Sequence, residues 1–524
     1  MNGDRAKSTI INRLLRSTVS NYIGRFVGLV TWILLTPFIL HQLDQSLFGL
    51  WVLVGSVVAF GSLLDFGIAG AVTKYVSEYQ AQGQIDQAKK LIATALYLYF
   101  ALGLVVILAS IAIAPIFPRL FNVSAEHKET AVWLVLLSGL GMGLAIPSTS
   151  TKAVLSGLQR FDLMNLLSVI TTLLSAGFTV IVLLSGGGVI GLVSVTIAVN
   201  LLVQIPAIRF IHRIAPELHF GLARPSRKML WTVTSFSSSL FLVHVGGQLE
   251  TKTDEIVIGA FLPVNAVTPY NLARKLSTLP QLMAEQFLSL LLPLASELHA
   301  ENNRGRLRSL YIISTRVTLG TFLAIGISLV VLAGPILTIW IGEEFAKYAY
   351  LVFILTLASF IDIPTWPAGF VLQGIGRHRF TAVMALCSGI ANLILSLILV
   401  QHLGLTGVAL GTLIPTAIIC LGFILPYAIR VIGVTVQQMY KYVFLPVFVP
   451  VIPAGLVTYL LRELFAPASI LLTLLIAAAG SLVYLTLYLR AESCEFEKTL
   501  FRDMVAKMFS YARNIRKGSK EGGY

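Results

Sequence analysis

The sequence predicts an all-α integral membrane protein with about fourteen transmembrane helices. Three observations predict this fold class: composition, the length of the apolar runs, and the placement of the basic residues. Of the 524 residues, 56% are hydrophobic and only 12% are charged, whereas soluble proteins carry about 25% charged residues. Because so few polar groups are available to face water, lipid must cover most of the surface.

Apolar runs of membrane-spanning length follow one another along the chain. A helix needs about 20 apolar residues to cross a bilayer. Six such runs lie near 19–40, 47–72, 91–114, 130–152, 162–185 and 188–208. Six more lie near 230–261, 266–296, 310–340, 348–372, 380–401 and 406–429, and the last two lie near 443–461 and 468–489.

The basic residues indicate the orientation of these helices. If both termini are cytoplasmic, 29 of the 38 Lys and Arg residues fall in inside segments and four fall outside. Short cytoplasmic loops of membrane proteins carry such an excess of Lys and Arg. One missed helix would invert every later loop, so the asymmetry supports both the number of helices and cytoplasmic termini.

The runs divide the chain into six segments. We expect a cytoplasmic N-terminal segment (1–18), an N-lobe (19–213), a cytoplasmic linker (214–229), a C-lobe (230–430), two further helices (443–489) and a cytoplasmic tail (490–524). The tail alternates basic and apolar residues. This pattern predicts an amphipathic helix on the anionic inner leaflet, and binding to a partner protein is the alternative.

An internal repeat relates the two predicted lobes. When the segments 146–160 and 363–377 are aligned without a gap, they share Ile, Pro, Val, Leu, Gly and Arg at equivalent positions. A second similarity pairs 188–191 with 404–407. Transporters are often built from repeats, so we expect two six-helix bundles related by a pseudo-twofold axis along the membrane normal. Chance similarity between apolar helices is the alternative.

Several other classes of protein are disfavoured. The formal charge of +14 does not indicate nucleic-acid binding, because the basic residues form no single patch. The sequence contains neither a P-loop nor an H-E-x-x-H motif. The three cysteines, Cys387, Cys420 and Cys494, have no metal-like spacing. We therefore expect no cofactor, no metal site and no enzymatic activity.

Basic residues within the predicted helices are candidates for substrate binding, since charge inside a membrane is costly. Arg25, Arg274 and Lys275 lie within such runs. In a central cavity they would bind an anionic group such as phosphate or pyrophosphate through charge-assisted hydrogen bonds. Alternatively, Arg25 reaches the inner headgroups, and the other two neutralise Asp254 or Glu255.

Four acidic residues within the predicted helices form a second set of candidates. They are Asp65, Asp254, Glu255 and Asp362. A buried carboxylate can carry a proton or bind Na⁺, so any of the four could couple transport to an ion gradient. Asp65 and Asp362 each stand beside a helix-breaking sequence, and bracing that break is the alternative role.

Several segments resemble the polysaccharide flippases of bacteria. They are 43–51 (LDQSLFGLW), 63–75 (LLDFGIAGAVTKY), 256–259 (IVIG) and 269–274 (PYNLAR). The resemblance runs from about residue 10 to residue 490. These flippases belong to the multidrug/oligosaccharidyl-lipid/polysaccharide exporter superfamily.

The resemblance implies twelve core helices in two lobes, two extra helices and transport by alternating access. It also implies a location in the bacterial inner membrane, an undecaprenyl-pyrophosphate-linked oligosaccharide as substrate, and a cationic cavity to which Arg25, Arg274 and Lys275 would contribute. A cation-coupled multidrug exporter of the same superfamily is the alternative function. A membrane glycosyltransferase or polymerase is less favoured, because no long outer loop with paired carboxylates is present.

Overall fold

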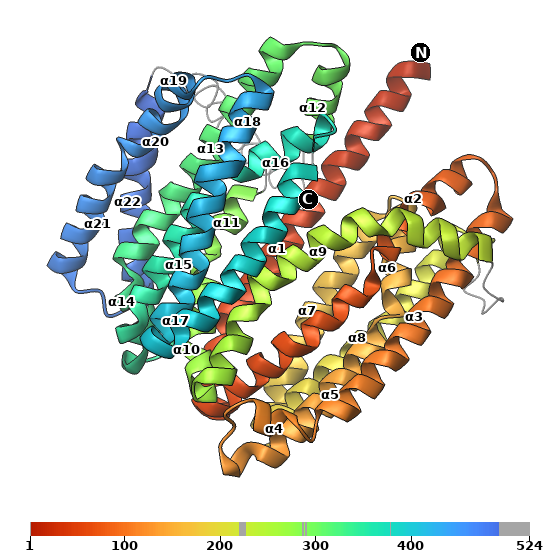
Figure 1. The fold of residues 1–524 in the computed structure, drawn as a ribbon, viewed down its shortest axis with the longest axis horizontal. Coiled ribbons are helices and arrows are strands. Elements are labelled where there is room, and N and C mark those ends of the chain that lie inside the picture. The colour runs from red at the N-terminus through yellow and green to blue at the C-terminus, as the bar shows by residue number, and fades with distance from the viewer. Residues whose placement is uncertain (1, 219–226, 286–287, 289–290, 378, 492–524) are drawn as a thin grey trace, which may run out of the picture. The chain divides into compact units, whose positions relative to one another are not determined.

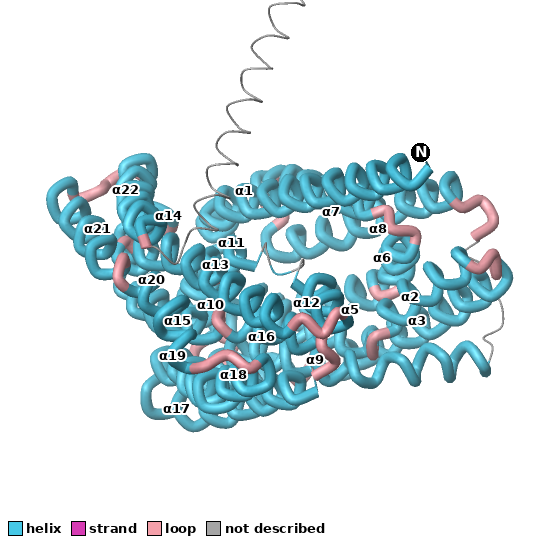
Figure 2. Tube along the Cα trace, turned by 90° about the horizontal axis from the view of Figure 1, so that it is seen from above, coloured by secondary structure: helices cyan, strands magenta, loops and turns pink. Residues whose placement is uncertain are grey.

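The part of the chain that the structure describes is entirely helical. This computed structural model describes residues 2–218, 227–285, 288, 291–377 and 379–491, which form helices and the connections between them (Figures 1 and 2). Ten helical stretches in this part are long and apolar enough to cross a membrane. The predicted all-α membrane fold is confirmed, whereas the number fourteen is not.

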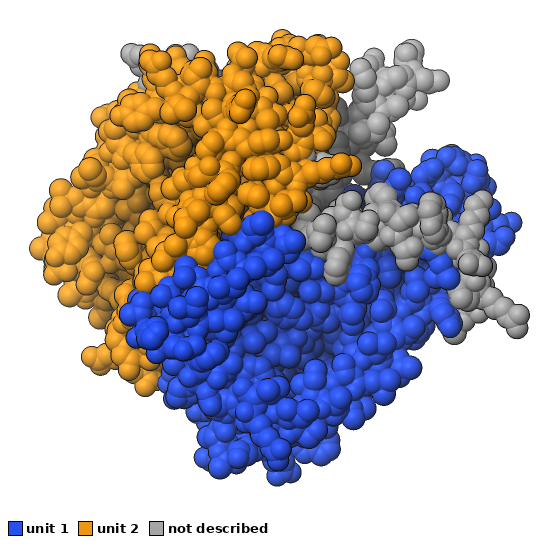
Figure 3. All heavy atoms as spheres, viewed as in Figure 1, with its two compact units in different colours: residues 1–271, 385–408 blue, residues 272–384, 409–524 orange. Residues whose placement is uncertain are grey.

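The helices form two compact units, residues 1–271 with 385–408 and residues 272–384 with 409–524 (Figure 3). The first unit holds α1 (Asn2–Ala59), η1 (Phe60–Asp65), α2 (Ile68–Ala81), α3 (Ile85–Ile113), α4 (Phe117–Leu120), η2 (Ala125–His127), α5 (Lys128–Ala145), α6 (Ser148–Gly157), α7 (Phe161–Leu184), α8 (Gly188–Ile214), α9 (Arg227–Phe261), η3 (Val264–Ala266) and the start of α10 (Val267–Ser277). The second unit holds α11 (Leu279–Ala284), α12 (Leu291–Ala300), α13 (Arg304–Val331), α14 (Ala333–Trp340), η5 (Glu343–Tyr348), α15 (Ala349–Asp362), α16 (Thr365–Gly374), η6 (Cys420–Ile424), α18 (Leu425–Ile432), α19 (Val436–Met439), η7 (Tyr440–Phe444), α20 (Leu445–Phe448), α21 (Val451–Phe465) and α22 (Ile470–Arg490).

The units group helices by contact, and α17 (Arg379–Ile419) contributes to both. The lobe boundaries expected from the sequence therefore stay a prediction. Residues 492–524 of the expected tail and 219–226 of the expected linker lie outside the described residues.

Two pairs of predicted runs are joined as continuous helical stretches with a kink. In α1 the kink is at Asp44, with φ 66° and ψ 171°, between the runs 19–40 and 47–72. The carboxylate of Asp44 accepts hydrogen bonds from the backbone N–H groups of Ser46 (2.7 Å) and Leu47 (2.9 Å), which caps the helix that follows. In α17 the kink is at Gly404, with φ 56° and ψ −132°, between the runs 380–401 and 406–429.

The run predicted at 266–296 is interrupted in the structure. It contains α10, α11 and α12 rather than one long helix. Pro280 stands in the first turn of α11, where its missing N–H costs no helical hydrogen bond, and its ring disfavours a helix that continues from α10. The preceding predicted run, 230–261, is a single helix, α9.

The internal repeat is visible in the backbone of two turns. After α6, the N–H of Arg160 donates to the carbonyl of Leu155 (2.9 Å), and after α16 the N–H of Arg377 donates to that of Leu372 (2.7 Å). These two bonds join residues that are equivalent in the alignment of 146–160 with 363–377. Residues in the left-handed region, Gln159 (φ 55°) and Gly376 (φ 76°), are equivalent in the same alignment.

A second pair of turns, α2–α3 and α12–α13, repeats at nearly the same spacing along the chain. The N–H of Gln84 donates to the carbonyl of Tyr79 (2.8 Å), and the N–H of Asn303 donates to that of Leu298 (2.9 Å). The local structure of the turns therefore supports duplication over chance similarity. The axis expected to relate the copies stays a prediction.

In each copy a glycine lies where two helices pack closely together, α2 with α6 in the first copy and α12 with α16 in the second. A Cβ atom added to Gly157 of α6 would lie 2.9 Å from the carbonyl oxygen of Thr73 on α2. A Cβ atom added to Gly374 of α16 would lie 2.8 Å from the Cβ of Ala295 on α12. Small residues let helices approach closely in membranes, so these glycines explain the repeated contact.

Candidate functional site

The three predicted cationic residues lie in different units. Arg25 is on α1 with an exposed side chain, whereas Arg274 and Lys275 occupy the last turn of α10 and are half-buried. A cation there is favoured by the dipole of the helix C-terminus. Ser277 and Thr278 close this end, because their hydroxyls donate to the carbonyls of Arg274 (2.8 Å) and Lys275 (2.8 Å). Their joint binding of one anion stays a prediction.

Asp65 lies at the helix break between η1 and α2. Its Oδ1 accepts a hydrogen bond from the hydroxyl of Tyr99 on α3 (2.6 Å) and one from the N–H of Ala69 (3.3 Å). The two residues that follow, Phe66 (φ 46°) and Gly67 (φ 78°), are in the left-handed region. These contacts join the helix break to α3, and both the bracing role and the ion-coupling role of Asp65 stay predictions.

Asp254 and Glu255 are buried on α9 and contact successive residues of α10. The hydroxyl of Tyr270 donates to Asp254 Oδ2 (2.6 Å), and the amide of Asn271 donates to Glu255 Oε1 (3.2 Å). Glu255 is only 1% exposed, and its Oε2 has no hydrogen-bond partner among the described residues. A buried carboxylate oxygen without a donor is costly, which makes Glu255 a candidate for a role beyond packing.

Asp362 ends α15, where its carboxylate accepts three hydrogen bonds. The donors are the indole of Trp366 (2.7 Å), the hydroxyl of Thr365 (3.1 Å) and the thiol of Cys420 (3.5 Å). Cys420 begins η6, a π-helical turn, and such turns are frequent at functional sites. The equivalent residue of the first copy is Ala145, so the break itself does not require a carboxylate.

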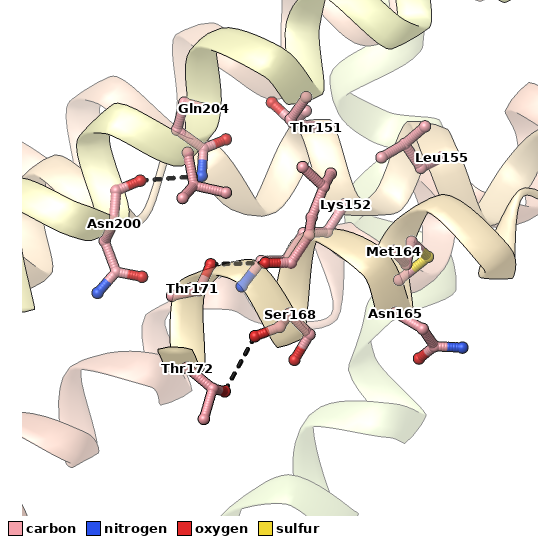
Figure 4. Close-up of a pocket in the computed structure, with 13 residues that line it drawn as sticks. Thr151, Lys152, Leu155, Met164, Asn165, Ser168, Thr171, Thr172, Asn200 and Gln204 are labelled. Atoms are coloured by element: carbon pink, nitrogen blue, oxygen red, sulfur yellow. Dashed lines mark hydrogen bonds between the residues drawn. The ribbon is translucent and has the colours of Figure 1, made fainter. Parts of the chain in front are cut away.

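A polar cavity that the sequence analysis missed lies inside the first unit, between α6, α7 and α8 (Figure 4). Its volume is about 330 Å³. The polar residues lining it are Thr151, Lys152, Asn165, Ser168, Thr171, Thr172, Asn200 and Gln204. The available sequence signal was the helical spacing of Asn165, Ser168 and Thr172, and of Asn200 and Gln204, each of which puts polar groups on one helix face.

Comparisons with known proteins agree with the helical architecture. The "Probable low-salt glycan biosynthesis flippase Agl15" of Haloferax volcanii is 24% identical over 412 residues, which are 77% of this chain and 81% of that protein. The solved structure of the lipid II flippase MurJ in an inward closed conformation matches with a TM-score of 0.71 at 17% identity, over 93% of this chain and 99% of that one.

A multidrug resistance MATE family transporter of the MOP superfamily, solved in an inward-facing conformation, also matches. Its TM-score is 0.62 at 16% identity, over 78% of this chain and 98% of that one. At these identities the two solved structures show a shared fold. Residues 13–299 match the family model described as polysaccharide biosynthesis protein, and because this match covers more than half of the chain, the protein belongs to the polysaccharide biosynthesis protein family.

Proposed function

We propose that the protein is a flippase that moves a lipid-linked oligosaccharide across the membrane by alternating access, for the synthesis of a polysaccharide. The observation that carries the proposal is the family match over residues 13–299. Similarity to a protein named as a glycan biosynthesis flippase and a fold shared with a lipid II flippase support it. The chain acts as a transporter and performs no covalent chemistry.

The anionic group of the substrate is a pyrophosphate on an undecaprenyl lipid, and Arg25, Arg274 and Lys275 bind it. Arginine offers paired donors that match phosphate oxygens, and lysine adds a point charge. The helix C-terminal position of Arg274 and Lys275 favours cations before substrate arrives.

A proton or Na⁺ gradient drives the cycle through one of the four carboxylates. Glu255 is supported by its buried oxygen without a hydrogen-bond partner among the described residues. Asp362 is supported by its position at a break that the first copy forms with Ala145. Asp65 and Asp254 remain candidates through their place within the predicted helices.

The protein lies in the bacterial inner membrane with both termini in the cytoplasm. The lopsided distribution of Lys and Arg supports this orientation, and the ten apolar helical stretches of the described residues support a multi-pass membrane protein.

Deleting the gene and restoring it tests the proposal. Loss of the protein should stop the production of surface polysaccharide, and the lipid-linked oligosaccharide should accumulate in the cytoplasmic leaflet. Arg25→Ala and Arg274→Ala should each lower export, whereas Arg119→Ala, an exposed arginine at the end of α4, should not. Export at the wild-type level from both test variants would contradict the anion site.

Multidrug export is the second candidate, because the fold is shared with a multidrug transporter. This function predicts that loss of the protein leaves surface polysaccharide intact and raises sensitivity to cationic drugs. Measuring drug sensitivity in the same deletion strain distinguishes the two.

A further inference from the structure

The polar cavity of the first unit does not serve to bind its helices together. Polar side chains in membrane helices often form hydrogen bonds between helices. Here the hydroxyl of Thr171 donates a hydrogen bond to the backbone carbonyl of Leu167 (2.8 Å). The side-chain amide of Asn200 donates to the backbone carbonyl of Thr196 (2.8 Å), and the side-chain amide of Gln204 donates to the backbone carbonyl of Asn200 (3.4 Å). Each bond stays within one helix, so these groups line the cavity (Figure 4) without bridging it.

Two polar atoms of the cavity lining have no protein partner among the described residues. The amide nitrogen of Asn165 and the amide oxygen of Gln204 are both buried and donate or accept no hydrogen bond. Buried polar groups are nearly always paired with protein, water or ligand. One donor and one acceptor therefore await a molecule that can offer both.

The second copy of the repeat shows that the fold does not need these polar residues. At the positions equivalent to Lys152, Asn165 and Ser168, the second copy has Gly369, Ala382 and Ala385. The turn between α6 and α7 nevertheless has the same backbone hydrogen bond as its counterpart after α16. A requirement of folding would apply to both copies, so these three polar residues are a feature of the first copy, whereas Thr171 has a polar counterpart in Ser388.

The lining indicates the chemical class of the ligand. It contains a single cation, Lys152, and its other polar groups are amides and hydroxyls. Sites for phosphate usually gather several charge-assisted donors, whereas neutral amides and hydroxyls suit a ligand rich in hydroxyl groups. A cavity of about 330 Å³ is at the small end of ligand sites and suits one sugar residue better than a whole oligosaccharide.

From these observations we infer that the cavity between α6, α7 and α8 binds one sugar residue of the lipid-linked oligosaccharide, with Lys152 contacting an acidic substituent of that sugar. The inference rests on the proposed function and adds to it a glycan site separate from the anion site. Asn165 donates to a sugar hydroxyl and Gln204 accepts from one.

Alkylation of a single cysteine in the cavity tests this inference. The variant carries Ser168→Cys in a full-length chain whose three natural cysteines are replaced by serine. Ser168 is exposed on the cavity side of α7. The control is Ser185→Cys, which is exposed in the connection between α7 and α8, outside the cavity. The rate of reaction with N-ethylmaleimide is compared in membranes from cells that make the lipid-linked glycan and from cells that lack its first sugar transferase.

We expect the glycan to slow alkylation at residue 168 several-fold and to leave the rate at residue 185 unchanged. Equal and fast rates in both membranes would show an empty cavity and overturn the inference. Equal and slow rates, with the control fast, would show a phospholipid headgroup in the cavity and would also overturn it. The proposed function is judged separately, by whether the deletion strain accumulates the lipid-linked glycan, so either idea can fail alone.

Gln204→Leu separates a binding role from a structural role. Extracted lipid-linked glycan is added to the membranes, and the concentration that halves the alkylation rate of residue 168 is measured. Loss of one hydrogen bond should raise this concentration about tenfold. Thermal stability should change little, because the variant removes an oxygen that has no partner among the described residues and one long bond, 3.4 Å, from the amide nitrogen to the carbonyl of Asn200. A lower melting temperature with unchanged protection would assign Gln204 to the fold. Lys152→Met should have the same effect on protection only for a glycan that carries an acidic sugar.

Discussion

At the scale of single residues, two carboxylates within the apolar helices accept hydrogen bonds from residues that are distant in the sequence. Asp65 and Asp362 were recognisable because a carboxylate in an apolar run is rare. Tyr99, which contacts Asp65, is 34 residues away, and Cys420, which contacts Asp362, is 58 residues away. Such pairs depend on how helices pack, and one sequence does not determine that packing.

The polar cavity was missed for a related reason. Asn165 and Gln204 are neutral and lie within apolar runs, so they change composition little. They are recognised as parts of a cavity only when the packing of α6, α7 and α8 is known, because they lie on two different helices.

Gly374 should be intolerant of any side chain. Gly374→Ala places a Cβ atom 2.8 Å from the Cβ of Ala295, and overpacking of this kind costs about 1–3 kcal/mol. Gly369→Ala on the same helix is the control, because its Cβ atom would have no neighbour within 4 Å. Unfolding in detergent should show a loss of stability for the first variant only, and equal stabilities would show that α16 can move away from α12.

Tyr99→Phe should destabilise the first unit by about 1–3 kcal/mol, because the half-buried carboxylate of Asp65 loses a donor. Tyr99 is 0% exposed and its hydroxyl lies 2.6 Å from Asp65 Oδ1. Tyr97→Phe on the same helix is the matched control, since Tyr97 is 52% exposed. If both variants unfold at the same denaturant concentration, the contact contributes nothing to stability.

At the scale of helices, the sequence located the breaks better than the form they take. The gaps at 41–46 and 402–405 hold the kinks at Asp44 and Gly404, which join helices that we expected to be separate. The stretch 266–296 is divided into three helices, although its apolar residues favour one long helix. Pro280 was the residue that could have predicted the first of these breaks.

Gly404→Ala should destabilise the protein through its backbone alone. The residue has φ 56° and ψ −132°, a conformation in which a Cβ atom costs about 1–2 kcal/mol, and no neighbouring atom lies within 4 Å of that Cβ. Gly177→Ala in α7 is the control, because it also has no neighbour within 4 Å and no positive φ. A similar melting temperature for the two variants would mean that the kink relaxes without cost.

At the scale of the whole molecule, composition and run length were sufficient to predict an all-α membrane protein. They were not sufficient to predict which helices share a compact unit. The segment 385–408 associates with the segment 1–271, although the two are far apart along the chain. Hydropathy describes the environment of a helix and carries no information about its neighbours.

The predicted orientation can be checked with single cysteines in a cysteine-free chain. Ser124 and Gln82 are both exposed, in the connections before α5 and before α3. The distribution of Lys and Arg places the first outside and the second inside. In intact cells a membrane-impermeant maleimide should label Ser124→Cys, and it should label Gln82→Cys only after permeabilisation. The reverse pattern would invert the topology.

The spacing between equivalent turns decreases slightly along the chain, since Gln84 and Asn303 are further apart in sequence than Arg160 and Arg377. The insertions or deletions that distinguish the two copies therefore lie between these turns, along the helices or in the connections at their other ends. The turns themselves kept their hydrogen bonds through that divergence. An epitope tag should accordingly be accepted between α4 and α5, and the same tag placed between α6 and α7 should abolish expression.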